Sequence, residues 1–182
     1  SYRYCLLQVI HDNFLMGKIT PSYFGEIYRM MMKEKDPLIM STAVDHMFKI
    51  ASDMTPEQRK TLELCMLDLL GENKSKECRQ YIIRKLGANA TSPEVLDRIE
   101  DIWRNHDDPL FSEHDFMEMA YRLAITRPGQ WESILQTERA FLKTDDQRKE
   151  FDYVSRACNP SEPDRTRLFN MLLKPEGRVQ EP

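Results

Sequence analysis

Residues 55–71 read TPEQRKTLELCMLDLLG and contain the start, body and end signals of one amphipathic helix. Thr55 precedes Pro56, and Gln58 follows Thr55 by three positions, which is the spacing of a reciprocal capping box. Apolar residues then recur at helical spacing as far as Leu70, and Gly71 suits the left-handed residue that ends many helices. The stretch therefore predicts a helix that begins after Thr55 and ends near Gly71.

The same start signals recur along the chain. A capping side chain stands in position to begin a further helix at Thr20, Asp36, Ser75, Ser92, Ser112 and Thr144. Thr91 and Glu94 have the spacing of a capping box, and Gly17 and Gly87 are expected helix ends. Thr144 and Gln147 have the same capping-box spacing. Because apolar residues follow each start at helical spacing and no segment alternates, about ten helices and no strands are expected.

The helix starts also repeat at a nearly constant interval. The interval is 35 residues from Thr20 to Thr55, 39 from Asp36 to Ser75, and 37 both from Thr55 to Ser92 and from Ser75 to Ser112. Each interval holds two helices, and a period near 37 lies between the tetratricopeptide and HEAT values. The sequence thus predicts an all-α, HEAT/ARM-like α-solenoid of about ten helices in antiparallel hairpins, with residues 1–182 as a single helical-repeat domain.

Composition limits the partners and the compartment. The 182 residues are 41% hydrophobic, but the longest apolar runs are four residues, so neither membrane insertion nor a signal peptide is expected. The net charge of −4 argues against duplex nucleic acid as a partner. A soluble protein is expected, and both a cytoplasmic and an exported or periplasmic location remain open. The chain starts at Ser1 without Met and stops at Pro182, so we expect a fragment of a longer protein.

Metal-binding and catalytic motifs are not apparent. The four cysteines form no CxxC pair, which excludes a zinc ribbon and favours buried free thiols. The one polar cluster with metal-ligand chemistry, residues 105–108 with 113–115, lies between two expected helices, where caps and solvated loop are the simpler interpretation. The H-E-x-x-H, Walker, G-x-S-x-G and EF-hand motifs are missing from the sequence.

The second half of the chain contains a stretch, residues 151–157, that reads FDYVSRA. It stands among Leu96-Asp97-Arg98, Ile102-Trp103, Asp115-Phe116, residues 120–124, Arg127-Pro128, Ile134-Leu135, Glu138-Arg139, Asp146, Arg148, Arg165, Leu168-Phe169, Leu172-Leu173 and residues 178–182. Together these residues resemble the C-terminal helical domain of the aminopeptidase N family of zinc metallopeptidases. The resemblance covers roughly residues 93–182 and is strongest over residues 151–157, whereas residues 1–92 match only in helical character and position.

The resemblance implies a parent protein that removes N-terminal residues from peptides with a zinc ion held in an upstream catalytic domain. That zinc site uses H-E-x-x-H and a G-x-M-E-N segment, and this sequence has neither. The chain therefore has no implied metal ligand, cofactor or catalytic residue, and alone it is expected to be inactive. The implied partners are the upstream catalytic domain and the peptide substrate, and the implied role is a lid that limits substrate size.

Tyr153 and Arg156 are the candidate substrate-contact residues, because they lie in the stretch with the strongest resemblance. An arginine can clamp the carboxylate of a peptide through two parallel hydrogen bonds. The alternative for Arg156 is an ion pair with Asp152, which precedes it by one helical turn.

Two other functions remain open on the sequence. The first is a free-standing HEAT-like adaptor that binds a protein or peptide along a concave face. The second is a helical-repeat nucleic-acid enzyme of the DNA glycosylase kind, against which the acidic net charge counts.

Overall fold

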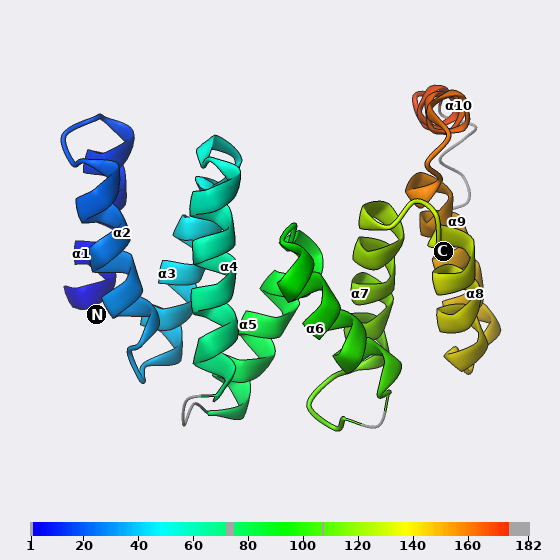
Figure 1. Ribbon diagram of the computed structural model, residues 1–182, viewed down its shortest axis with the longest axis horizontal. Helices are drawn as coiled ribbons and strands as arrows, with labels where there is room; N and C mark the ends of the chain where they lie inside the picture. Colours follow the sequence, from blue (N-terminus) through cyan, green and yellow to red (C-terminus); the bar gives the residue numbers. More distant parts are fainter. Residues whose placement is uncertain (1, 72–74, 107, 175–182) are drawn as a thin grey trace. The chain divides into compact units, whose positions relative to one another are not determined.

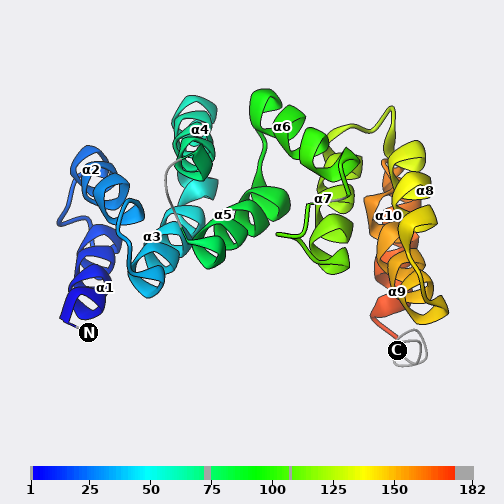
Figure 2. The same cartoon turned by 90° about the horizontal axis from the view of Figure 1, so that it is seen from below.

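A computed structural model describes residues 2–71, 75–106 and 108–174 of the chain, and within these ranges all regular structure is helical (Figures 1 and 2). The all-α class is thus confirmed, while the solenoid arrangement of the hairpins stays a prediction. The ten α-helices of the described residues are α1 (Tyr2–Leu15), α2 (Pro21–Met32), α3 (Pro37–Lys49), α4 (Pro56–Gly71), α5 (Lys76–Asn89), α6 (Pro93–Arg104), α7 (Glu113–Thr126), α8 (Trp131–Phe141), α9 (Asp145–Ser155) and α10 (Glu162–Leu172). Two short 3-10 helices, η1 (Ala51–Asp53) and η2 (Arg156–Cys158), follow α3 and α9.

The chain divides into two compact units, and the division falls within α6, after Leu96. Unit 1 comprises residues 1–96 and unit 2 comprises residues 97–182. None of the described helices is long and apolar enough to cross a membrane.

Local capping explains where most helices begin. Thr55 Oγ1 accepts a hydrogen bond from Gln58 N at 3.3 Å, and Gln58 Oε1 accepts one from Thr55 N at 3.0 Å. The Thr144–Gln147 box forms in the same way, with distances of 3.2 and 3.0 Å. Each box satisfies two N–H groups of a first helical turn, which have no carbonyl partner within the helix. The expected caps at Thr20, Asp36, Ser75 and Ser112 also form.

One expected capping box and one expected helix end are wrong, although α6 begins at Pro93, directly after the expected start at Ser92. The Thr91–Glu94 capping box does not form, because Thr91 donates from both its N and its Oγ1 to Glu63 of α4, and Glu94 pairs with Lys60. Gly87 does not end α5, which runs two residues further to Asn89. Gly17 does follow the end of α1, with φ of 71°, a left-handed conformation that glycine adopts without steric cost.

Glu63 is fully buried and joins α4 to the start of α6 within unit 1. Its carboxylate accepts from Ser92 N at 2.8 Å, from Thr91 N at 2.9 Å and from Arg59 Nε at 3.1 Å. Burial alone would raise the pKa of Glu63, but the hydrogen bonds from Ser92 and Thr91 outweigh it and leave the pKa below its ordinary value.

Two stacked histidines lie inside the α1–α3 packing of unit 1. The rings of His11 and His46 are 4.1 Å apart at their centroids, and both residues are buried. Tyr28 Oη lies 2.7 Å from His46 Nδ1 and donates to the Leu7 carbonyl at 3.2 Å. Burial lowers the pKa of His46 to about 4 and also lowers that of His11, with the Lys49 charge acting in the same direction on both. Both rings are therefore neutral at pH 7.

The core of unit 2 is formed where α7 packs on α8 and α8 on α9. Large side chains from several helices are fully or almost fully buried there, among them Trp103, Phe116, Leu123 and Phe151. Cys158, which follows α9, is buried against the Tyr121 carbonyl of α7. None of the four cysteines forms a disulfide, but only Cys78 and Cys158 are buried, so the expectation of buried thiols fails for exposed Cys5 and half-buried Cys65.

Candidate functional site

A pocket of about 520 Å³ in unit 2 lies beside Arg156, one of the two residues singled out from the sequence. Helices α9 and α10 supply most of its lining residues, and η2 follows α9 in the segment between them. The course of these two helices can be followed in Figures 1 and 2. Its lining residues are Trp131, Asp152, Ser155, Arg156, Asn159, Asp164, Arg167, Leu168 and Met171.

The turn between η2 and α10 fixes the shape of one side of the pocket. Asn159 Oδ1 accepts from Ser161 N at 2.8 Å, a side-chain turn of the kind that asparagine favours. Arg165 Nη1 donates to the Asn159 carbonyl at 2.7 Å, which ties the turn to α10. The pocket therefore rests on a braced turn between two helices, which limits how far its wall can move.

Both carboxylates of the pocket wall already have basic or amide partners. Asp152 accepts two hydrogen bonds from Arg139 of α8, at 2.7 and 2.9 Å. Asp164 accepts from Arg167 Nη1 at 3.1 Å and from Asn159 Nδ2 at 3.4 Å. The acidic groups of the wall are thereby largely neutralised.

Arg156 is the exception among the charged residues of the wall. Its Nη2 lies 3.6 Å from the Met171 sulfur, and within the described ranges no carboxylate comes within ion-pair distance of its guanidinium. The alternative of an Asp152–Arg156 ion pair is wrong, because Arg139 holds Asp152 with the two-point geometry that arginine and carboxylate favour. The pocket thus carries one exposed positive charge without an acidic partner.

The rest of the wall combines apolar surface with one unsatisfied hydroxyl. Trp131 at the start of α8, Leu168 and Met171 provide the apolar part. Ser155 Oγ is buried and makes no hydrogen bond to any described residue. A buried hydroxyl without a partner is costly, so a ligand oxygen or nitrogen that reached it would be stabilised. Tyr153, the other residue singled out from the sequence, is half-buried on α9 and does not line the pocket.

The thiol next to the pocket is not suited to nucleophilic chemistry. Burial, together with the smaller effect of the Glu118 charge, raises the pKa of Cys158 to about 11. Because the thiolate is the reactive form, a thiol with this pKa stays protonated at neutral pH. The pocket can hold a ligand, but it offers no activated nucleophile in Cys158.

A second buried polar cluster of unit 2 involves the segment considered above for metal binding. Glu138 Oε2 accepts from Trp103 Nε1 at 2.6 Å, and His106 Nε2 lies 3.1 Å from the same oxygen. The His106 ring stacks on Phe116 and Phe141, at centroid distances of 4.2 and 3.9 Å. Burial raises the pKa of Glu138, and the Trp103 hydrogen bond and the His106 charge offset part of that increase.

The remaining polar groups of that segment stabilise local structure. Asp108 accepts from Leu110 N at 2.9 Å, and Asp115 accepts from Ser112 N at 2.8 Å in the capping box of α7. Nowhere in the described part of the chain do three His, Cys, Asp or Glu side chains gather closely enough to hold a metal ion. Asp107, part of the same segment, lies outside the described residues, as do residues 178–182 of the family resemblance.

Arg156, singled out from the sequence, lines the pocket, whereas most of the groups that surround it were not singled out. Trp131, Ser155 and Met171 come from three different elements, and nothing in their local sequence marks them as neighbours. Arg139 and Arg167, two of the arginines in the last quarter of the sequence, are the residues that neutralise the acidic wall. Comparisons of the chain with protein-family models, with characterised proteins and with solved structures found no match.

Proposed function

We propose that this chain is the C-terminal helical domain of a zinc aminopeptidase, where it covers the active-site cleft and limits the size of the peptides admitted. In this proposal its hairpins stack as an irregular HEAT-like solenoid, and the zinc belongs to a catalytic domain upstream. The support from the sequence is the resemblance over residues 93–182. The residues described here do not form a zinc site, and the proposal assigns no catalytic step to them.

The observation that carries the proposal is the Arg156 pocket. A short peptide presents a carboxylate at its far end, and Arg156 offers a guanidinium without a competing acid among the described residues. Trp131, Leu168 and Met171 provide apolar surface for the last side chain of such a peptide.

The pocket would bind such a peptide weakly. Arg156 is exposed, and a charge pair at an exposed position gains about 0–1 kcal/mol because water screens it. Weak binding suits a lid, since interactions that hold a substrate equally in the ground and transition states do not raise the rate of the chemical step. A peptide would be oriented by the lid and released after each turnover.

The test uses the full protein that carries this chain. We expect an H-E-x-x-H motif upstream of Ser1, bound zinc, and release of N-terminal residues from short peptides, whereas the 182-residue chain alone hydrolyses none. In the full protein, Arg156→Gln should raise KM for peptides with a free carboxylate by roughly two- to fivefold, with little change for the corresponding amides. Arg98→Gln, an exposed arginine of α6, is the matched control and should change neither value.

Two results would overturn the proposal. One is an encoded protein without H-E-x-x-H, which would leave the adaptor hypothesis in its place. The other is stoichiometric zinc with hydrolysis of aminoacyl reporter substrates by the isolated chain.

A further inference from the structure

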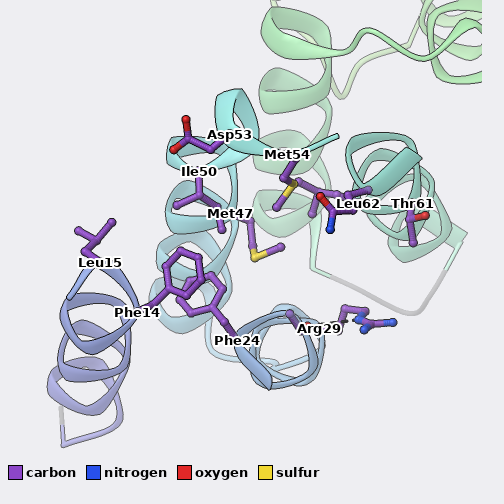
Figure 3. A pocket seen from close by; sticks show the side chains of 12 residues that line it. Phe14, Leu15, Phe24, Arg29, Met47, Ile50, Asp53, Met54, Thr61 and Leu62 are labelled. Atoms are coloured by element: carbon purple, nitrogen blue, oxygen red, sulfur yellow. Dashed lines mark hydrogen bonds between the residues drawn. The ribbon is translucent and has the colours of Figure 1, made fainter. Parts of the chain in front are cut away.

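Unit 1 contains an apolar groove of about 540 Å³ that is separate from the Arg156 pocket (Figure 3). It lies between the end of α1, one face of α2, the end of α3 with η1, and the first half of α4. Its apolar wall is formed by Phe14, Phe24, Met47, Ile50, Met54 and Leu62. The volume falls within the range of ordinary ligand sites, about 300–1,000 Å³.

The groove has one rigid wall and one adaptable wall. Phe14 and Phe24 stack at a centroid distance of 4.1 Å, and Phe24 stacks in turn on buried Tyr28. Figure 3 shows Met47 and Met54 apart from this aromatic pair, pointing into the space between the helices. Methionine side chains are flexible and polarisable, so they adapt to apolar groups of different shapes.

Gly25 keeps the α2 side of the groove open. It stands in the interior of α2, where glycine is less favourable than alanine, and its φ is not positive. A Cβ atom at Gly25 would find only Arg29 Nη2, at 4.0 Å, so the packing of the helix does not require glycine there. The backbone of α2 is thus left bare on a wall of the groove, at a cost in helix stability that packing does not explain.

The rim of the groove carries one basic and one acidic side chain, Arg29 and Asp53. Arg29 Nε donates to the Gly25 carbonyl at 3.2 Å, and in the described part of the chain no acid forms an ion pair with Arg29. Asp53 of η1 is exposed, and no described cation pairs with it. In Figure 3 the two side chains extend from different elements, α2 and η1, on different sides of the apolar residues.

We propose that this groove binds an amphipathic helical segment of another protein, whose apolar side chains enter between the phenylalanines and methionines. An acidic residue of the segment pairs with Arg29, and a basic residue pairs with Asp53. An open trough with charges of both signs fits a peptide better than a fatty acid, which has one carboxylate and needs an apolar wall at its other end. The groove does not depend on the function proposed for the Arg156 pocket.

The probe is a synthetic 14-residue helical peptide with leucines on one face, glutamates in one half and lysines in the other. Binding is followed through the 13C-methyl signals of Met47 and Met54, which report on the groove alone. We expect both signals to move, with a dissociation constant in the range of about 10 μM to 1 mM. An analogue with glutamine at every charged position should bind roughly three- to tenfold more weakly.

Gly25→Ala separates binding from folding. It should raise the melting temperature by about 2–4 °C through helix propensity, yet weaken binding of the peptide at least about fivefold because the methyl group enters the groove. Gly129→Ala is the matched control, since a Cβ there meets nothing within 4 Å, and it should leave binding unchanged.

Four results would overturn the proposal. The first is that the methionine signals do not move at 1 mM peptide, and the second is that Gly25→Ala binds the peptide as tightly as the unmodified chain. The third is that the signals respond to lauric acid in place of the peptide. The fourth is that the signals change only when sedimentation shows self-association of the chain.

Discussion

Glu63 Oε2 accepts a hydrogen bond from the backbone N of Ser92 at 2.8 Å, so a buried carboxylate of α4 caps the start of α6 from 29 residues away. The same carboxylate also accepts hydrogen bonds from the N and Oγ1 of Thr91 and from the Nε of Arg59. This one side chain satisfies donors that a local capping box would otherwise have to satisfy.

Glu63→Ala should destabilise unit 1 by about 3 kcal/mol, because it leaves several buried donors without a partner. Urea denaturation followed by circular dichroism measures the change. Asp68→Ala, at an exposed position of the same helix, is the control and should change the free energy of unfolding by less than about 0.5 kcal/mol. A loss below 1 kcal/mol for Glu63→Ala would contradict the capping role.

Acid should loosen unit 1 through its histidine pair. The folded pKa of His46 is about 4, against about 6.5 in the unfolded chain, so the unfolded state binds more protons between these values. Stability therefore falls as pH drops from 6.5 towards 4, by about 2 kcal/mol between pH 7 and pH 5 from His46 alone. Lowering of the His11 pKa adds in the same direction. The groups that face the pair are Tyr28, Asp12, Asp45 and Lys49.

His11→Phe tests the source of this pH dependence. Neither ring nitrogen of His11 makes a hydrogen bond to a described residue, so phenylalanine keeps the stacked ring at little cost. The variant should match the unmodified chain at pH 8 and be more stable at pH 5. His114→Gln, an exposed histidine of α7, should leave the pH profile unchanged. An unchanged profile in His11→Phe would exclude His11 as a contributor.

The contribution of Glu138 to stability should change with pH in the opposite direction to that of the histidine pair. Its folded pKa lies above that of the unfolded chain, so its contribution to stability is largest at low pH and declines as pH rises through the folded pKa. Hydrogen exchange at pH 5 and pH 7 should thus show greater acid loosening in α1–α3 than in α8. Equal loosening of both regions would contradict the two assignments.

Substitutions at Glu138 separate its charge from its hydrogen bond. Glu138→Gln keeps an acceptor for Trp103 and should cost less than about 1 kcal/mol at pH 7, because it removes a buried charge. Glu138→Ala leaves the Trp103 N–H unsatisfied and opens a cavity, and it should cost about 2–4 kcal/mol. Thermal unfolding compares the stability of the two variants. Equal losses of stability would show that the Glu138 charge, and not its hydrogen bond to Trp103, stabilises the fold.

Arg139 should influence the Arg156 pocket without lining it. Arg139→Gln frees Asp152, which lies one turn before Arg156 and can then pair with it. The exposed Arg139–Asp152 pair itself is worth no more than about 1 kcal/mol of stability. Affinity for peptides with a free carboxylate should nevertheless fall by about threefold, measured by calorimetric titration. An unchanged affinity would show that Asp152 does not compete for Arg156.

The sequence predicts correctly those helix starts at which two residues three positions apart cap each other. The Thr55–Gln58 and Thr144–Gln147 boxes form as expected, since each depends only on its own first turn. The Thr91–Glu94 box fails because Glu63 competes for Thr91 from 28 residues away. A sequence signal for this did exist, since Glu63 stands between Leu62 and Leu64 on an apolar stretch, where a carboxylate needs partners.

The candidate site shows the same limit of sequence reasoning. Arg156 could be singled out from the sequence. That Arg156 forms no ion pair with Asp152 depends on Arg139, which belongs to another helix and lies 13 residues from Asp152. Helical spacing favours the pair within α9 and η2, whereas packing of α8 on α9 favours the pair between helices. Local spacing cannot decide between them, because the choice depends on how the helices pack.

The most direct test of the Arg156 pocket compares two forms of one ligand, the tripeptide Gly-Leu-Phe with a free carboxylate and the same tripeptide as its C-terminal amide. The measurement is the shift of the Trp131 indole N–H signal on titration into the 182-residue chain. We expect that the free acid moves this signal with a dissociation constant near 1 mM, that the amide binds about two- to fivefold more weakly, and that Arg156→Gln removes the difference. Equal binding of acid and amide, or a Trp131 signal that responds to neither, would contradict a carboxylate site at Arg156.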